Sequence, residues 1–370
     1  MPAQTRRQLA AHPARYRRSP GLVIHWAGSE LVCTDCVSGR RFAVSPEALS
    51  VLVRLDGGTS AAAIAAAHPE IGGLAAIDDL LAQLVRAKVI APGVNGAWPW
   101  TTWMPEAAFF HFGTKATRFP ADPRQHDREL RAKAVDSPPP APVKAIAGRA
   151  TTLPAAGDLG GLTRVLRERR TWRNFSAAKV GLPEMATLLQ TTFGVQRWGT
   201  VKGQGRVVLK TSPSAGARHP IEAYLLAANV KGLSAGIYHY DSARHRLVAL
   251  KRKMSKGLLV RVLANQQYFA DAAAIVIMSA VFARSMWKYP SSRAYRAILI
   301  DAGHLGQTFC LAATALGLAP FSTMAFREHE VDSVLGIDGV SEGAMYVVGV
   351  GTRAAGHEGR PGRIATRGTT

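Results

Sequence analysis

The sequence lacks a long hydrophobic run: no stretch of about 18 or more apolar residues occurs, so no transmembrane helix is expected. Residues 1–20 hold five arginines and no acid. They have no apolar core, which argues against a secretory signal. A basic tail on a cytoplasmic protein is one interpretation of this segment, and an organellar transit peptide is the other.

Cysteine is also scarce. Three cysteines in 370 residues do not make a disulfide framework, and this favours a reducing compartment. Cys33 and Cys36 form one Cys-x-x-Cys pair, but a structural zinc needs four ligands and no second pair lies nearby, so no metal is expected. Cys310 lies in an apolar stretch that predicts a core position. A Gly-x-Gly-x-x-Gly after a strand is absent, which argues against a Rossmann nicotinamide site.

Acidic residues are few. The chain has 46 Lys and Arg against 25 Asp and Glu, a formal net charge of +21. Such a charge attracts polyanions at long range, and an anionic leader peptide would be one such partner. The arginines are spread along the chain rather than gathered in one stripe, which equally fits a generally arginine-rich protein.

Residues 21–95 predict a small module. Short strands are expected at 22–26, 30–34 and 39–44. Ser45 is the expected cap of a first helix and Thr59 of a second, with a third helix at 77–87 before a closing strand at 89–90.

This order of elements predicts a winged-helix-like domain. It resembles PqqD-like modules, which bind leader peptides as an added strand. Packing support and DNA binding are the alternatives. The third helix opens with Asp78 and Asp79, which would repel phosphate, so nucleic acid is not expected as a partner.

Residues 96–157 are rich in aromatic side chains with little periodicity. The seven rings belong to Trp98, Trp100, Trp103, Phe109, Phe110, Phe112 and Phe119. We expect them to pack against the next domain or to line a peptide-binding cleft, because aromatics at this density are rarely left in water. The proline-rich run at 136–142 predicts a stiff linker and the domain boundary.

From residue 158 to 356 helical and strand-like segments alternate, ahead of a C-terminal tail at 357–370. Helices are expected at 159–169, 183–192 and 295–318, and strands at 223–230, 236–240, 246–250, 273–281 and 344–350. The run 273–281 is almost continuously apolar, as in a strand buried on both faces. We predict an α+β domain around one central mixed sheet.

Three groups of residues in this domain point to a site. The first is an arginine cluster with a hydroxyl at a helix end, made of Arg169, Arg170, Thr171 and Arg173. Its cations and donor suit a phosphate monoester, although such clusters are common in a basic chain. The second, residues 211–220, predicts either a rigid turn that approaches a flat ring or an ordinary loop. The third is the Lys288–Tyr289 pair, which alone would be a surface lysine and a packed tyrosine.

Together these groups resemble nitroreductase-like flavoproteins, and more narrowly the azoline dehydrogenases of the SagB/McbC type. That family carries Arg-Arg-Ser-x-Arg-x-Phe where this chain has residues 169–175, with threonine in place of serine. It carries Pro-Ser-Ala-Gly where this chain has residues 213–216, and its catalytic Lys-Tyr pair coincides with residues 288–289. The resemblance covers residues 160–355 well and residues 21–95 more loosely.

The resemblance implies a nitroreductase-like fold with FMN as cofactor. It implies phosphate and ribityl contacts from Arg169, Arg170, Thr171, Arg173 and Arg353. It also implies flavin contacts from Pro213, Ser214, Ala215, Gly216 and Arg218, some of them across a homodimer interface. Backbone contacts to the flavin are implied for Thr323 and Met324. Pro320 departs from the family, which often has a small residue or cysteine there.

The implied reaction is the oxidation of thiazoline or oxazoline rings to azoles in a leader-bearing precursor peptide, with oxygen as electron acceptor and a cyclodehydratase (heterocyclase) as partner. Removing a proton from the ring needs a base, and a desolvated lysine can serve where arginine cannot. Lys288 is the expected base and Tyr289 the orienting or relay group, or the reverse. The alternatives are a flavin oxidoreductase that reduces nitro or quinone compounds with NAD(P)H or oxidises another peptide bond, and a non-catalytic scaffold for leader and heterocyclase.

Overall fold

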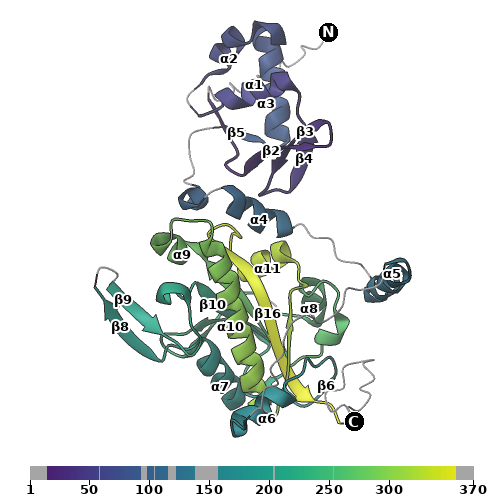
Figure 1. The fold of residues 1–370 in the computed structure, drawn as a ribbon, viewed down its shortest axis with the longest axis vertical. Coiled ribbons are helices and arrows are strands. Elements are labelled where there is room, and N and C mark those ends of the chain that lie inside the picture. Colours follow the sequence, from purple (N-terminus) through teal and green to yellow (C-terminus); the bar gives the residue numbers. More distant parts are fainter. Residues whose placement is uncertain are drawn as a thin grey trace, which may run out of the picture. The chain divides into compact units, whose positions relative to one another are not determined.

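The computed structural model describes residues 15–57, 59–92, 98–103, 105–115, 122–137, 157–202, 205–252 and 254–355. The chain divides into two compact units, Met1–Thr117 and Arg118–Thr370 (Figure 1). This division comes before the proline-rich run at 136–142, where the sequence predicts the boundary. Residues 138–142 of that run and most of the expected basic and C-terminal tails lie outside the described residues.

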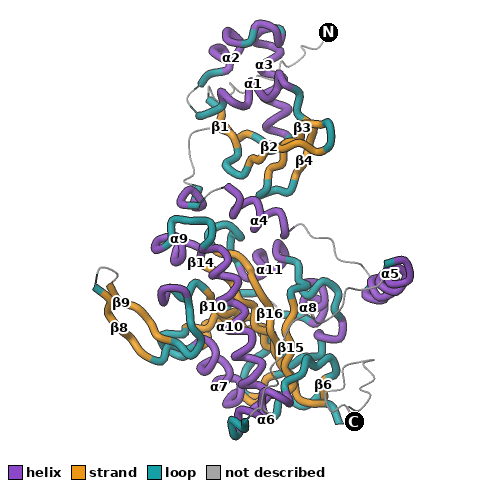
Figure 2. The backbone as a smooth tube through the Cα atoms, viewed as in Figure 1, coloured by secondary structure: helices purple, strands orange, loops and turns teal. Residues whose placement is uncertain are grey.

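Within the described part of the first unit, short strands and three helices are followed by a fourth helix in the aromatic segment (Figure 2). Strands β2 (Leu22–Ala27), β3 (Glu30–Asp35) and β4 (Arg40–Ala43) form an antiparallel sheet, and β1 (Tyr16–Arg18) pairs with β5 (Ile90–Pro92). The helices are α1 (Pro46–Arg54), α2 (Ala61–Ala67) and α3 (Gly73–Arg86). The elements follow the expected order, and the winged-helix assignment stays a prediction.

Serine side chains cap the first two helices. Ser45 accepts an N–H of the first turn of α1 at 3.3 Å, as expected. The cap predicted for the second helix, Thr59, is wrong by one residue, because Ser60 accepts an N–H of α2 at 3.2 Å. Thr59 instead donates its N–H to Asp56 at 3.2 Å, and its neighbour Ser60 accepts the N–H at the start of α2.

Cys33 and Cys36 are both buried in the first unit, where Cys33 packs in the core with Val51 and Ile64. Burial, together with the nearby Asp35 carboxylate, raises the pKa of each thiol to about 11. Both thiols therefore stay protonated near neutral pH, and a protonated thiol is a poor metal ligand. Within the described ranges no three His, Cys, Asp or Glu side chains come together in a metal-binding arrangement.

The described parts of the aromatic segment are largely helical, which the weak periodicity of this segment did not predict. It forms a short 3-10 turn (Pro99–Thr102) and α4 (Pro105–Lys115), and α5 (Pro123–Asp136) follows. Trp100 and Phe112 are buried, with ring centroids 5.4 Å apart. These rings pack on one another across the turn and α4, while Phe119 lies outside the described residues.

The second unit is centred on an antiparallel sheet. Its order is β13 (Arg246–Ala249), β12 (Gly236–Asp241), β10 (Ile221–Ala227), β14 (Ala274–Val281), β16 (Glu342–Arg353) and β15 (Ala319–Thr323), with β6 (Phe175–Ser176) paired to the end of β16. Every pair in it is antiparallel, so the expected mixed sheet is wrong. Helices connect β14 to β15 and these two strands run in the same direction, but β16 lies between them and pairs antiparallel with both, so no parallel neighbours arise.

Helices cover both faces of this sheet. On one face, α10 (Ala294–Ala315) packs against β15, β16 and α7 (Leu182–Phe193), and α6 (Gly161–Glu168) packs against α10 (Figure 1). The core on the other face includes residues of α8 (Lys256–Val262) and α11 (Glu328–Leu335). Its centre is a stacked pair, Phe269 and Phe321, with ring centroids 3.8 Å apart. No helix in the described part of the chain is both long and apolar enough to span a bilayer.

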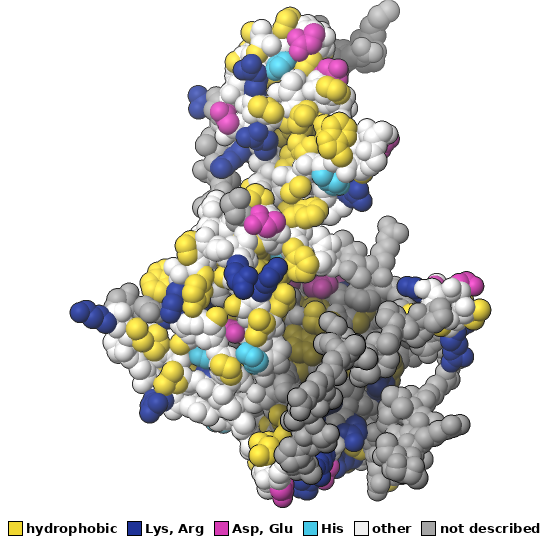
Figure 3. All heavy atoms as spheres, in the orientation of Figure 1, with side chains coloured by type: hydrophobic (Ala, Val, Ile, Leu, Met, Phe, Trp, Pro, Cys, Tyr) yellow, Lys and Arg dark blue, Asp and Glu magenta, His cyan; other side chains and the backbone are white. Residues whose placement is uncertain are grey.

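Two small β elements flank the sheet. Strands β7 (Val180–Gly181) and β11 (Val230–Lys231) pair in parallel, and β8 (Arg197–Val201) and β9 (Gly205–Leu209) form a hairpin that projects from the sheet (Figure 1). This hairpin was not predicted from the sequence. On the face drawn in Figure 3, Lys and Arg side chains are scattered among apolar and neutral ones, as expected for basic residues spread along the chain.

Candidate functional site

The predicted flavin loop, residues 213–219, is held by a buried carboxylate on α10. Ser214 Oγ donates to Asp301 at 2.5 Å, and the Ala215 N–H donates to the same carboxylate at 3.4 Å. The His219 N–H donates to Ser214 Oγ at 2.9 Å and ties the two ends of the loop together. Burial raises the pKa of the Asp301 carboxyl. His219 has a φ of 43°, a strained conformation that these contacts must stabilise.

Lys288 and Tyr289 lie against this loop at the end of α9 (Phe282–Lys288). Lys288 Nζ donates to the Gly216 carbonyl at 3.3 Å. A Cβ on Gly216 would lie 2.6 Å from Lys288 Nζ and would also clash with the Tyr289 hydroxyl, and the φ of Gly216 is +56°. Glycine is therefore the residue that lets both side chains approach the loop. The structure brings the predicted catalytic pair and the predicted flavin loop together.

Basic side chains surround the same loop. Arg218 lies over the exposed ring of Trp287, with its guanidinium carbon 5.0 Å from the ring centroid. Burial lowers the pKa of Lys210 to about 8, and burial together with the charge of Lys210 lowers that of His219 to about 4. His219 is thus neutral at pH 7, while Lys210 remains mostly cationic. This surrounding favours a group that carries or develops negative charge.

The predicted phosphate-binding arginines gather at the other end of α10. Arg353 donates to two carbonyls there, at 3.2 and 3.5 Å, the second belonging to Thr314. Its guanidinium carbon lies 5.5 Å from the ring centroid of Trp172. The Trp172 N–H donates to the Pro320 carbonyl at 2.9 Å, and this bond fixes residues 169–173 beside the start of β15.

The charges of this group fit an anionic ligand. The described residues provide no carboxylate that forms an ion pair with Arg169, Arg170, Arg173 or Arg353. Arg170, Arg173 and Arg353 are exposed, and Thr171 adds a half-buried hydroxyl. Guanidinium groups without an anionic partner, beside a small hydroxyl donor, are the chemistry that a phosphate monoester requires.

Thr323 and Met324, the predicted backbone contacts, lie in a turn held by Gln266. The Thr323 hydroxyl donates to Gln266 Oε1 at 3.2 Å, and Gln266 Nε2 donates to the Ala325 carbonyl at 2.5 Å. Tyr268 also donates to Gln266, and its ring lies 5.7 Å from the guanidinium carbon of Arg173. The turn is therefore linked to the arginine group. Sequence reasoning missed Gln266 and Tyr268, because no motif marks them.

The two groups of predicted residues are separated along α10. Asp301, which holds the loop, and Thr314, which Arg353 contacts, are thirteen residues apart, about 20 Å along the helix axis. A hollow of about 450 Å³ beside Phe175 and Lys256 contains none of the predicted cofactor or catalytic residues. Within one chain, the predicted site residues thus form two half-sites: a loop half with Lys288 and an arginine half with Arg353.

Comparison with known proteins defines the class. Residues 166–352 match the model of the nitroreductase family, and the chain belongs to this family. It is similar to a protein of Methanocaldococcus jannaschii named as a nitroreductase, with 31% identity over 176 residues, which covers 48% of this chain and 84% of that protein. It is also similar to the trifolitoxin-processing protein TfxB of Rhizobium leguminosarum bv. trifolii, with 33% identity over 184 residues. That match covers 46% of this chain and about half, 48%, of TfxB.

Two solved structures are among the similar ones. A nitroreductase of Anabaena variabilis is 28% identical, with a TM-score of 0.46 and coverage of 53% of this chain and 39% of that chain. A chain of the E. coli microcin synthetase McbBCD complex with truncated pro-MccB17 is 20% identical, with a TM-score of 0.46 and coverage of 65% and 86%.

Membership of the nitroreductase family makes this chain an oxidoreductase with FMN as its cofactor. The residues present fit that cofactor in two parts. The arginine half provides guanidinium groups that form no ion pair with a described carboxylate and suit the phosphate, and the loop half provides a closely packed backbone with Lys288 that suits a flat ring. Each half thus contains residues of the motifs that resemble the flavoprotein family.

Gly216→Ala should separate Lys288 and Tyr289 from the loop, since the added methyl needs space that both side chains fill. We expect the free energy of unfolding to fall by about 1–3 kcal/mol in urea titrations, because a left-handed φ disfavours alanine. Gly257→Ala in α8 is the matched control. Its Cβ would meet no atom within 4 Å, and alanine should stabilise this helix by up to about 1 kcal/mol. Equal stabilities of the two variants would contradict this role of Gly216.

Proposed function

We propose that this chain oxidises thiazoline or oxazoline rings to the corresponding azoles in a ribosomally made, leader-bearing peptide. The observation that carries the proposal is the contact of Lys288 and Tyr289 with Gly216 in the flavin loop. A base beside the ring is what azoline oxidation needs in addition to a flavin. The similarity to a protein named for trifolitoxin processing supports a peptide as the substrate.

The chemistry divides between the side chains and the cofactor. An azoline becomes an azole by losing one carbon-bound hydrogen as a proton and another as a hydride. Lys288 takes the proton, and the Tyr289 hydroxyl orients the ring or relays that proton to solvent. Bound FMN would supply the hydride acceptor, with oxygen as the final oxidant, and each azole formed would then be matched by one hydrogen peroxide.

A complete site requires two copies of the chain. Arg169, Arg170, Thr171, Arg173 and Arg353 would hold the FMN phosphate and ribityl chain. The loop residues Pro213, Ser214, Ala215, Gly216 and Arg218 would approach the ring from the second copy, and the Thr323–Met324 turn would face it from the first. The distance of about 20 Å between the halves of one chain supports this homodimer, in which each FMN touches both copies.

The first unit would hold the peptide by its leader. Among the described residues β2 pairs only with β3, so its outer edge is available for an added strand. Trp26 at the end of β2 is 70% exposed and offers an apolar contact beside that edge. A cyclodehydratase that forms the azolines would act before this chain on the same peptide. Packing support and DNA binding remain the alternatives for this unit.

The test is turnover of a defined substrate by the purified dimer. A leader-bearing peptide with one thiazoline should lose two hydrogens, measured by mass spectrometry, and release an equal amount of hydrogen peroxide. Removal of the leader should raise KM about 10-fold or more without changing kcat, because it removes binding contacts remote from the ring. Protein that is colourless after reconstitution with FMN, or that leaves the thiazoline unchanged, would refute the proposal.

A second function is favoured by one comparison. The M. jannaschii protein named as a nitroreductase matches over 84% of its own length, which supports reduction of a nitro or quinone compound with NAD(P)H. Such a reaction needs no base at residue 288. Nitro reduction that is unaffected by Lys288→Ala, together with the absence of azole formation by the unaltered chain, would favour this second function. A non-catalytic scaffold would show neither reaction.

A further inference from the structure

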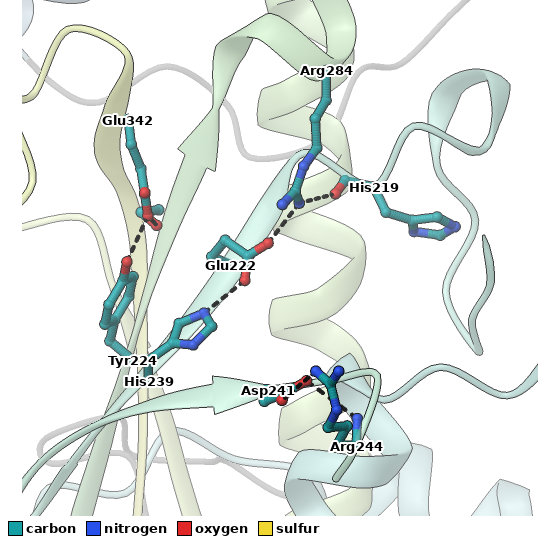
Figure 4. A network of polar contacts seen from close by, with 9 residues as sticks. His219, Glu222, Tyr224, His239, Asp241, Arg244, Arg284 and Glu342 are labelled. Atoms are coloured by element: carbon teal, nitrogen blue, oxygen red, sulfur yellow. Dashed lines mark hydrogen bonds and ion pairs between the residues drawn. The ribbon is translucent and has the colours of Figure 1, made fainter. Parts of the chain in front are cut away.

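Glu222, a carboxylate on β10, joins the sheet to the helix that ends at Lys288 (Figure 4). Its side chain is 17% exposed and contacts two basic side chains. Arg284 on α9 approaches Oε1 at 2.6 Å, and His239 on β12 approaches Oε2 at 2.8 Å. Burial opposes ionisation of Glu222, but the hydrogen bond to His239 and the charge of Arg284 outweigh it and lower the pKa of Glu222. Glu222 is therefore ionised at neutral pH.

Arg284 also reaches the flavin loop. Its Nη1 donates to the His219 carbonyl at 3.0 Å (Figure 4). Arg284 and Lys288 are four residues apart in α9 and lie on the same side of the helix. Both donate to loop carbonyls, Arg284 to that of His219 and Lys288 to that of Gly216. One side of α9 thus contacts the loop at two points, and Glu222 anchors the first of them.

The ion pair with Arg284 belongs to Glu222 and not to the neighbouring Glu342. Glu342 on β16 accepts from the Tyr224 and Ser279 hydroxyls, at 2.9 and 2.5 Å, and forms no ion pair with a basic side chain among the described residues (Figure 4). Lys210, at the end of β9, and Arg284 both lie close enough to Glu222 for a charge interaction. Without the Glu222 carboxylate these two cations would repel each other. Arg284, whose side chain is already 42% exposed, would then turn to solvent.

We propose that Glu222 is a positioning residue: its ion pair with Arg284 fixes α9 on the sheet and thereby sets where Lys288 lies against the 213–219 loop. The inference rests on the proposed function only for its effect on turnover. Its structural part, that Glu222 holds α9 and the loop together, is independent of the reaction that the chain carries out.

Glu222→Gln removes the charge and keeps the size of the side chain. In hydrogen-exchange measurements on the FMN-bound protein, we expect the amides of residues 213–219 and 282–289 to exchange about 10-fold faster, because their mutual contacts open more often. The kcat for azole formation should fall about 10- to 100-fold with KM little changed, since a misplaced base slows the chemical step. FMN content should stay unchanged, because the arginine half lies at the other end of α10.

Asp241→Asn is the matched control. Asp241 on β12 is also ion-paired, to Arg244 (Figure 4) and to Arg246, and its side chain is 15% exposed, but both partners belong to the turn and strand that follow β12. Its loss should change neither the exchange of α9 and the loop nor kcat. Arg284→Gln removes the same ion pair from the more exposed partner and should reproduce the effects of Glu222→Gln, which keeps the test open if Glu222→Gln does not fold.

A double-mutant cycle shows whether Glu222 acts through Lys288. In a Lys288→Ala background, Glu222→Gln should cause no further loss of residual turnover. An equal loss with and without Lys288, or normal exchange of α9 and the loop in Glu222→Gln, would overturn the proposal. If the unaltered chain forms no azole, the proposed function fails, and the exchange data alone decide the role of Glu222.

Discussion

Lys288→Ala is expected to lower kcat for azole formation by about 1,000-fold while the protein remains yellow. A positioned general base contributes about 10²- to 10⁴-fold to such a reaction, and solvent replaces it poorly. FMN should be retained, because its phosphate would be held by arginines about 20 Å away along α10. Rapid-mixing absorbance would separate the two effects, since flavin reduction by the peptide should slow while the flavin content stays constant.

The control for this variant is Lys256→Ala. Lys256 is an exposed lysine of α8 that pairs with Asp271, and it touches neither half-site. The Lys256→Ala variant should turn over the peptide at the same rate as the unaltered protein. A Lys288→Ala variant that keeps full activity would show that Lys288 is not the base, and the assignment would then pass to Tyr289. Tyr289→Phe, which removes only the hydroxyl, tests that reversal.

Mixed dimers of two inactive chains should regain about half of the normal activity. One chain carries Lys288→Ala in the loop half, and the other carries Arg353→Glu in the arginine half, where the new carboxylate repels the FMN phosphate. If each site combines the arginine half of one copy with the loop half of the other, the mixed dimer contains one intact site and one doubly defective site. Two affinity tags would isolate it, and both FMN content and azole formation would be measured.

A chain that carries both substitutions provides the control. Paired with an unaltered chain, this doubly substituted chain spoils one half of each shared site, so the dimer should be inactive. Sites contained within single chains would give the opposite pair of results: no activity when the substitutions lie on different chains, and half of the activity when they lie on the same chain. The two dimers together therefore decide how the site is assembled.

Local patterns in the sequence predict most of the elements. The buried strand at Ala274–Val281 was expected at 273–281 from its unbroken apolar run, and α10 was expected at 295–318 from its length and composition. The antiparallel order was missed because periodicity identifies a strand without its neighbours. The cap of α2 was misplaced because Thr59 and Ser60 are both suitable, and only the bond from Thr59 to Asp56 decides between them.

The site was predictable as motifs but not as an arrangement. The residues of both halves could be listed from the sequence, yet nothing in their spacing shows that they lie toward opposite ends of a 22-residue helix. Asp301, Gln266 and Glu222 escaped assignment for a related reason. Each is a single polar residue whose partner is distant in the chain, as with Ser214 and Asp301, which are 87 residues apart. Only the tertiary fold brings such pairs together.

The span of α10 has a consequence for how this enzyme can change. If FMN binds between copies, the length of α10 sets the distance between the two half-sites of each chain. It therefore sets the positions of both cofactors in the dimer. Inserting one residue would shift one end by about 1.5 Å and rotate it by about 100°, and symmetry would repeat the error at both cofactors. Insertions should therefore be excluded from α10, whereas the β8–β9 hairpin, whose strands contain none of the predicted site residues, should accept them.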